Sequence, residues 1–165
     1  MRGVVILLSL TYSRNFVCTE KESNMAYWLL KTEPSTYSYS DLERDKKTTW
    51  DGVRNNLALK HIRAMKKGDL AFIYHSGDEK SIVGIAEIVS DSYPDPKQKD
   101  EKLAVVDLKP KEKLKNPVTL AAVKAQKEFA QFELVRMPRL SVMPVSAAQW
   151  KTLLAISADR QAMSK

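Results

Sequence analysis

The segment from Trp50 to Asn55 groups side chains that can hold a planar ring with hydrogen-bonding edges. The Trp50 indole offers a face for stacking, and the Asn55 carboxamide both donates and accepts hydrogen bonds, as two-point contact with a base edge requires. The Arg54 guanidinium is a planar fork that suits a phosphate or a ring acceptor. Gly52 lets the backbone around Val53 approach a ligand closely. These properties favour a ligand such as a nucleobase.

Two apolar runs, Tyr27–Lys31 and Phe72–Tyr74, carry or lead into polar and aromatic side chains of the same kind. Trp28, Trp50 and Tyr74 are the expected stacking faces, because an aromatic ring stacks on any base. Hydroxyls come from the threonine and the serine that follow the two runs. The sequence therefore gives these candidate ligand-binding residues: Trp28, Lys31, Thr32, Trp50, Gly52, Val53, Arg54, Asn55, Tyr74, His75 and Ser76.

Several of these residues also fit purely structural roles. Trp28 lies in an apolar run and suits a core position, and Asn55 precedes an amphipathic stretch whose helix it can cap. Arg54 can pair with Asp51, and His75 can be a satisfied structural histidine. The sequence leaves both interpretations open for each of them.

The charge balance favours an anionic partner, nucleic acid first. Lys and Arg number 27 and Asp and Glu number 20, which gives a net charge of +7. Such an excess attracts phosphates in a salt-sensitive manner. The expected phosphate contacts follow the Trp50–Asn55 segment: Lys60, Arg63, Lys66 and Lys67.

Nothing in the sequence predicts a catalytic centre, a metal site or a cofactor. There is no glycine-rich phosphate loop and no HExxH, CxxC or G-x-S-x-G motif. Cys18 is the single cysteine, so it has no internal disulfide partner, and a reducing compartment such as the cytoplasm is expected.

Residues 1–24 are expected to be a non-native or mis-called extension, and residues 25–165 a single domain. The apolar run Val4–Leu10 resembles the hydrophobic region of a signal peptide, which is the alternative, but no convincing cleavage site follows it. The run is too short to span a bilayer. Without residues 1–24 the remainder keeps a charge of 24 − 18 = +6.

Short strands with helices at their edges predict a closed or nearly closed mixed sheet with helices outside it. The expected strands are Tyr27–Lys31, Leu70–His75, Ser81–Ser90, Lys102–Leu108, Leu134–Val135 and Arg139–Met143, the last closed by Pro144. The expected helices are Asp41–Lys46 capped by Ser40, Leu57–Met65 capped by Asn55 or Asn56, Thr119–Gln126, and Ala147–Ile156 capped by Ser146. A loop is expected over Trp50–Arg54.

Five ordered blocks of the chain resemble the EVE domain family. They are Ala26–Pro34, Trp50–Asn55, Met65–Asp69, Phe72–Ser76 and Arg139–Val145, and together they run from about Met25 to Ile156. The resemblance implies an α+β fold, a PUA-like mixed β-barrel flanked by helices. It also implies a protein that binds DNA or RNA carrying a modified base, with methylated or hydroxymethylated cytosine favoured. Separately, the protein is expected to be a monomer without enzymatic activity and without a membrane or metal partner.

Two other functions remain open. The related ASCH domains include amidohydrolases that use Lys, Thr and Glu, and Lys31-Thr32-Glu33 has those residue types. Neighbours in a strand point to opposite faces, however, which would separate Thr32 from the other two. The second alternative is a protein-interaction module with no nucleic-acid ligand.

Overall fold

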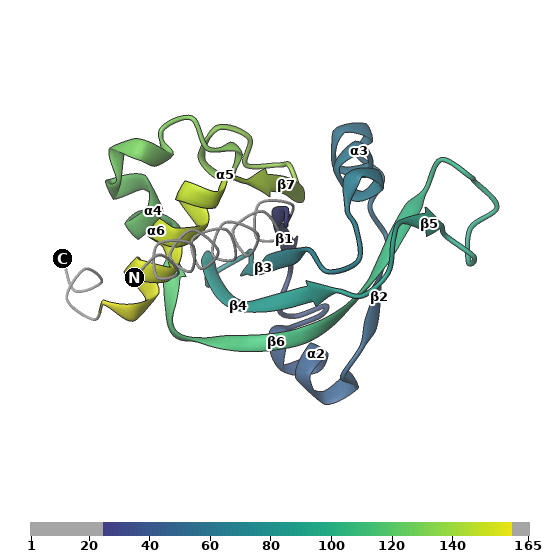
Figure 1. Ribbon diagram of the computed structural model, residues 1–165, viewed down its shortest axis with the longest axis horizontal. Coiled ribbons are helices and arrows are strands. Elements are labelled where there is room, and N and C mark those ends of the chain that lie inside the picture. Colours follow the sequence, from purple (N-terminus) through teal and green to yellow (C-terminus); the bar gives the residue numbers. More distant parts are fainter. Residues whose placement is uncertain (1–24, 160–165) are drawn as a thin grey trace, which may run out of the picture.

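The computed structural model describes residues 25–159, which form a mixed sheet curled into a half-barrel with helices around it (Figure 1). The predicted extension over residues 1–24 lies outside the described residues. The strands are β1 (Tyr27–Thr32), β2 (Thr48–Trp50), β3 (Leu70–His75), β4 (Ser81–Ile88), β5 (Tyr93–Pro94), β6 (Ala104–Thr119) and β7 (Val142–Val145). The helices are α2 (Tyr39–Asp45), α3 (Asn56–Ala64), α4 (Leu120–Ala125), the 3-10 turn η1 (Lys127–Phe129), α5 (Glu133–Arg136) and α6 (Ala147–Ala158).

The sheet has the strand order β2-β6-β4-β3-β1-β7, and β5 pairs with β6 off this path. β1 runs parallel to β3, and the other pairings are antiparallel. Among the described residues no pairing joins the edge strands β2 and β7, so the expected barrel is open on one side. The curl nevertheless brings β2 towards the end of β1, where Thr32 and Trp50 line one pocket.

The two faces of the central strands bury different partners. On one face Trp150 of α6 stacks on Tyr27 and Phe72, with ring centroids 4.5 and 3.9 Å apart. On the other face Trp28 lies 6.0 Å from the ring of His61 in α3. Stacked and tilted aromatic pairs of this kind stabilise the fold beyond what the burial of their apolar surface contributes. The sheet therefore holds α6 on one side and α3 on the other.

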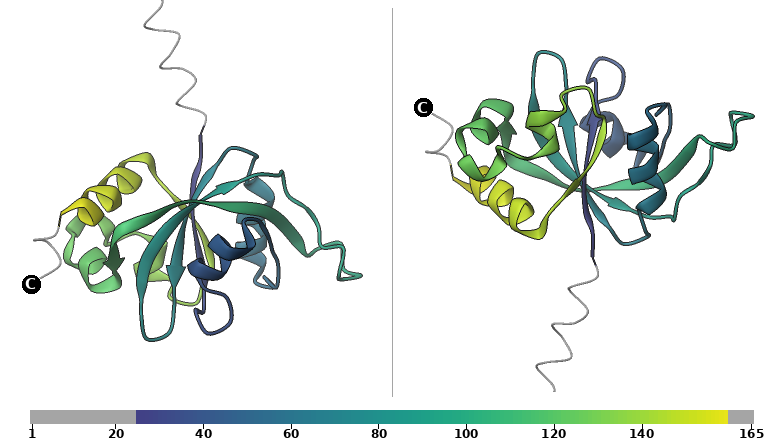
Figure 2. Two further views of the ribbon diagram at one scale, coloured as in Figure 1. Left: turned by 90° about the horizontal axis from the view of Figure 1, so that it is seen from below. Right: turned by 90° about the horizontal axis from the view of Figure 1, so that it is seen from above.

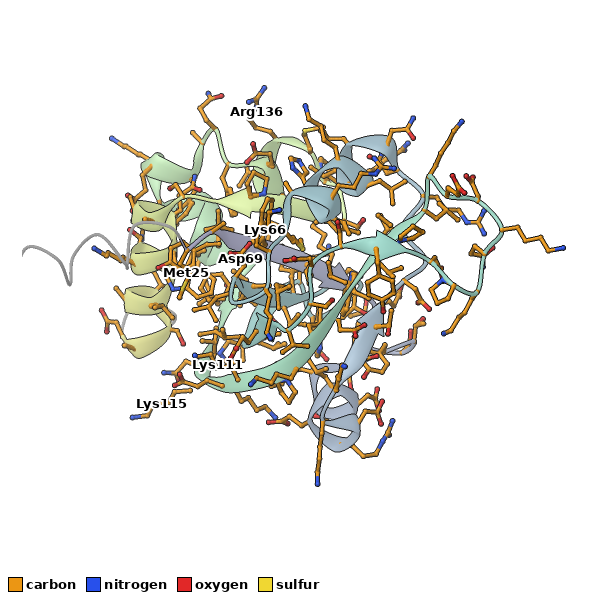
Figure 3. All side chains as sticks on the ribbon, turned by 45° about the vertical axis from the view of Figure 1, so that its right-hand side comes forward. Met25, Lys66, Asp69, Lys111, Lys115 and Arg136 are labelled. Carbon is orange, nitrogen blue, oxygen red and sulfur yellow. The ribbon has the colours of Figure 1, made fainter. Side chains whose placement is uncertain are left out.

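A buried carboxylate ties the start of β1 to the segment between α3 and β3. Asp69 is only 4% exposed, and it accepts hydrogen bonds from Ala26 N at 3.3 Å, Trp28 Nε1 at 3.0 Å and Lys66 N at 2.9 Å. Figure 3 shows Asp69 and Lys66 next to each other on this part of the molecule. Three donors compensate the carboxylate for its lost water, and the arrangement fixes the Trp28 indole in the core.

Several predicted elements are confirmed, with small shifts at their ends. β3 has the predicted bounds, and Asn55 and Ser146 are the helix caps. The first helix was placed two residues late: Ser38, not Ser40, is its cap. Ser38 accepts from the Asp41 backbone N–H and donates its own backbone N–H to the Asp41 side chain, a reciprocal pair that Ser40 does not make.

Four predictions about strands were wrong, and one short strand at residues 93–94 was not predicted. β2 replaces the start of the predicted loop because Thr48–Trp50 pairs with β6, and residues 93–94 pair with β6 as well. β6 continues far beyond Leu108, to Thr119. The predicted strand at Leu134–Val135 is part of helix α5. β7 contains Pro144 instead of ending before it, which an edge strand tolerates because its outer backbone groups need no partner.

Candidate functional site

A pocket of about 290 Å³ lies where β2 approaches the end of β1. Its walls are Thr32, Thr36 and Tyr37 on one side and Thr48, Thr49, Trp50 and Asp51 on the other. We call it the β1–β2 pocket. It is close to the lower end of the roughly 300–1,000 Å³ range of small-molecule sites, which suits one planar ring with substituents. The walls combine one large aromatic side chain with several hydroxyl groups.

Trp50 is 8% exposed and lines the β1–β2 pocket. Every fully buried side-chain N or O atom in residues 25–159 has a hydrogen-bond partner. The Trp50 indole N–H has no partner within these residues, so it is not fully buried. On the opposite wall, Thr32 Oγ1 donates to the Tyr37 carbonyl at 2.8 Å and so holds the segment after β1 in place.

Asp51 lines the same pocket and also a neighbouring open hollow that contains Lys97. Its Oδ2 accepts from Lys97 Nζ at 3.0 Å, and the side chain remains partly exposed. An ionised carboxylate has about four acceptor sites, so the ion pair leaves capacity for a further donor. Asp51 thus places an acceptor at the boundary between the two hollows.

A second hollow, of about 370 Å³, lies on the other side of the end of β1. It is lined by Asn55, Leu57, Arg136, Met137, Pro138, Arg139 and Leu140, and we call it the arginine hollow. Lys31 Nζ donates to the Pro138 carbonyl at 2.9 Å and lies 5.5 Å from the centre of the Tyr74 ring. Burial lowers the pKa of the Lys31 ammonium. The lysine thereby fixes the segment before β7 against the sheet.

The predicted residues do not share one hollow, which corrects the expectation from the sequence. Thr32 and Trp50 line the β1–β2 pocket, whereas Asn55 lines the arginine hollow. Gly52, Val53 and Arg54 border a third, very small hollow beside β6. The chain turns at Gly52, where φ is +76°, so successive residues of this segment face different hollows.

A family model described as the EVE domain matches residues 26–156. The chain belongs to the EVE domain family. Mouse thymocyte nuclear protein 1 is 31% identical over 164 residues, covering 79% of this chain and 73% of that protein. The NMR structure of Rpa0253 from Rhodopseudomonas palustris is 43% identical, with a TM-score of 0.78, and covers 86% of this chain and all of that one. The human THYN1 protein in complex with DNA containing 5-methylcytosine is 29% identical, with a TM-score of 0.76, and covers 82% and 99%.

The PUA-like α+β fold inferred from the resemblance is confirmed for this EVE domain. Trp28 and Tyr74, however, belong to the core of the fold: they are 6% and 3% exposed, and the Trp28 N–H is held by Asp69. Neither ring lines the β1–β2 pocket. Their predicted role as stacking faces is therefore not supported.

His75 and Ser76 position the backbone of the EVE domain instead of lining a pocket. His75 Nε2 accepts from the Tyr39 backbone N–H at 3.0 Å, which places the ring proton on Nδ1, 2.7 Å from Glu79 Oε2. Ser76 donates to the Thr32 carbonyl through its backbone N–H and its hydroxyl. Both residues thus fix the chain next to the β1–β2 pocket.

The predicted phosphate contacts, Lys60, Arg63, Lys66 and Lys67, are exposed on α3 and the turn after it. The Arg63 guanidinium donates to the Lys102 carbonyl, which connects α3 to the β5–β6 region. Their contact with phosphate remains a prediction. No group of three or more metal-ligating side chains occurs within residues 25–159, and no helix in that range is long and apolar enough to cross a bilayer.

Sequence reasoning missed the residues that complete both hollows. The β1–β2 pocket also needs Thr36, Tyr37, Thr48, Thr49 and Asp51, and the arginine hollow needs Leu57 and Arg136–Leu140. Asp51 carried a signal, because it lies inside the Trp50–Asn55 segment. Thr48 and Thr49 carried no such signal, because their position opposite the end of β1 depends on the pairing of β2 with β6, more than fifty residues away.

The geometry does not support an amidohydrolase built on Lys31, Thr32 and Glu33. Lys31 donates to the Pro138 carbonyl, whereas Thr32 donates to the Tyr37 carbonyl. The two side chains leave β1 on opposite faces, as alternation in a strand requires. Cooperating acid–base groups must lie within hydrogen-bond reach of one substrate proton.

Proposed function

We propose that this EVE domain binds DNA and reads a modified cytosine that enters the β1–β2 pocket. The observation that carries the proposal is a ring-sized pocket lined by Trp50, Asp51 and several hydroxyl groups, in which the indole N–H and the carboxylate would serve as donor and acceptor. The net charge of +7 favours a polyanion. The complex of the human THYN1 protein with 5-methylcytosine DNA adds support through a relative of the same fold.

The pocket chemistry fits cytosine better than thymine. Cytosine presents an exocyclic amino group, and carboxylates are the side chains that accept from it. Asp51 provides that acceptor, and the Trp50 N–H can donate to a ring nitrogen or carbonyl of the same base. A base in a duplex must leave the stack to reach such a pocket, at a cost of a few kcal/mol. Contact with an aromatic face returns roughly 1–3 kcal/mol.

The proposal is tested by comparing affinities for otherwise identical DNA. Fluorescence anisotropy should show tighter binding to an oligonucleotide with one 5-methylcytosine or 5-hydroxymethylcytosine than to one with plain cytosine, at each of several salt concentrations. Equal affinities across the titration would reject the reader function and leave a charge-driven binder. Protein partners that resist nuclease treatment, together with no DNA binding, would instead favour the protein-interaction alternative.

Replacing Asp51 with alanine should lower the preference for 5-methylcytosine over thymine by about 10-fold, the size of one lost charge-assisted hydrogen bond. The measurement is the ratio of the two affinities for single-stranded DNA. Lys97→Ala is the matched control, because it removes the ion-pair partner of Asp51 and leaves the carboxylate in the pocket. A preference that falls equally in both variants would argue against recognition by Asp51.

A further inference from the structure

We propose that the arginine hollow binds the DNA strand on either side of the base held in the β1–β2 pocket. This inference rests on the proposed function, since it assigns the surface on which the same DNA lies. None of the predicted phosphate contacts, Lys60, Arg63, Lys66 and Lys67, lines this hollow. Its two arginines come from α5 and the segment before β7, and its exposed apolar side chains come from that segment and from the first turn of α3.

The two hollows lie on opposite sides of a single strand end. Thr32 lines the β1–β2 pocket, and its neighbour Lys31 is hydrogen-bonded to Pro138 in the wall of the arginine hollow. The segment Asp51–Asn55 also begins at the pocket and ends at the hollow. In Figure 2 the segment after β1, the β3–β4 turn and the segment before β7 lie at one end of the sheet. A nucleotide in the pocket therefore has its neighbours close to the hollow.

The charge of the arginine hollow complements a phosphate backbone. Arg136 and Arg139 are exposed and form no ion pair with any residue of 25–159, and no acidic side chain lines the hollow. A guanidinium binds phosphate oxygens through two parallel hydrogen bonds. The Asn55 side-chain Oδ1 accepts from the Leu57 and Ala58 backbone N–H groups, which leaves the side-chain N–H₂ as a further donor.

Two exposed apolar side chains line the same hollow as these cations. Leu57 and Met137 are 37% and 40% exposed, and among residues 25–159 only Met25 is another large apolar side chain of comparable exposure. Proteins that distort DNA use apolar side chains to fill an opened base step. Removing a base from the stack opens such a step. Leu57 and Met137 are therefore placed to contact the exposed faces of the neighbouring bases.

The charge contribution is tested with the double variant Arg136→Gln/Arg139→Gln and a matched control, Lys111→Gln/Lys115→Gln. The control removes the same charge from β6, away from Arg136, as Figure 3 shows. The arginine variant should reduce the slope of log affinity against log salt by about 2 for duplex DNA, since each phosphate contact contributes about 0.9. Affinity should fall ~10-fold for modified and unmodified DNA alike, so their ratio stays constant. The control should match the wild type.

The apolar contribution is tested with Leu57→Ser/Met137→Ser. This variant should weaken binding to duplex DNA but leave binding to a single strand with the same 5-methylcytosine unchanged, because a single strand has no opened step to fill. Equal losses on both DNA forms, or on neither, would reject the contact with neighbouring bases.

The outcomes separate this inference from the proposed function. An unchanged salt slope in the arginine variant, or an equal change in the lysine control, would overturn the inference even if the wild type prefers 5-methylcytosine. A reduced slope without any such preference would support the DNA surface and reject the reader function. If an acidic peptide competes for the arginine hollow, and the salt slope for DNA binding is unchanged in the arginine variant, the hollow would belong to a protein partner. That result would overturn the inference.

Discussion

Replacing Thr36 with tyrosine is expected to abolish the preference of the protein for DNA that carries a modified cytosine. Thr36 lies on the segment after β1 and forms part of the pocket wall. A tyrosine there adds a ring to a space of about 290 Å³, which is the size of one planar ring with substituents. Affinity for 5-methylcytosine DNA should fall by about 30-fold, the equivalent of roughly 2 kcal/mol of lost stacking and hydrogen bonding. Anisotropy titrations with modified and unmodified DNA measure the effect.

The neighbouring substitution Ser35→Tyr provides the control. Ser35 is exposed on the same segment but does not line the pocket, so its replacement introduces the same side chain without obstruction. Thr48→Tyr enters from the opposite wall and should reproduce the effect of Thr36→Tyr. If both folded wall variants keep the wild-type preference, the base is bound elsewhere. Loss of preference in the Ser35 variant would show that the segment, not the pocket, was disturbed.

The site could be predicted from the sequence only where local chemistry decides it. The Asn55 cap depends on residues two and three positions away, so the sequence predicts it. The composition of Leu70–His75 is typical of a buried strand, so β3 was also predicted. For Trp28 and His75 the sequence could not decide between the binding and the structural role, because their polar atoms are satisfied by Asp69 and by the Tyr39 backbone, 41 and 36 residues distant. An aromatic or polar side chain looks available in a sequence until its partner is known.

The pocket itself is a product of long-range pairing. β2 is three residues long and carries no strong strand signal, yet its pairing with β6 brings Thr48 and Trp50 opposite Thr32. Arg136 and Arg139 were not predicted as part of a site, because their segment reaches the end of β1 through long-range contacts. These contacts are the β1–β7 pairing and the hydrogen bonds of Lys31 to Pro138 and Ser141. The sequence therefore drew attention to the Trp50–Asn55 segment, but the division of its residues among three hollows could not be predicted.

Replacing Asp69 with alanine should produce the largest loss of stability among the variants considered. The substitution leaves three donors without their acceptor: the Trp28 indole N–H and the backbone N–H groups of Ala26 and Lys66. A buried donor without a partner costs about 1–3 kcal/mol, and water can replace part of what the two backbone groups lose. We expect the free energy of unfolding to fall by about 3 kcal/mol, a large share of the typical 5–15 kcal/mol. Urea denaturation measures it, with an unchanged m-value showing that the same surface unfolds.

Asp91→Ala is the matched control, because Asp91 accepts from the next backbone N–H group, that of Lys67 at 3.0 Å, but is exposed to solvent. Water can replace that acceptor, so the loss should stay below about 1 kcal/mol. Equal losses in the two variants would contradict a buried structural role for Asp69. Well below its unfolding temperature, the Asp69 variant should still prefer 5-methylcytosine, since Trp28 lies outside the β1–β2 pocket. The Gly68-Asp69 block would then serve the EVE domain by fixing Trp28 and the start of β1, while recognition depends on the tryptophan of β2.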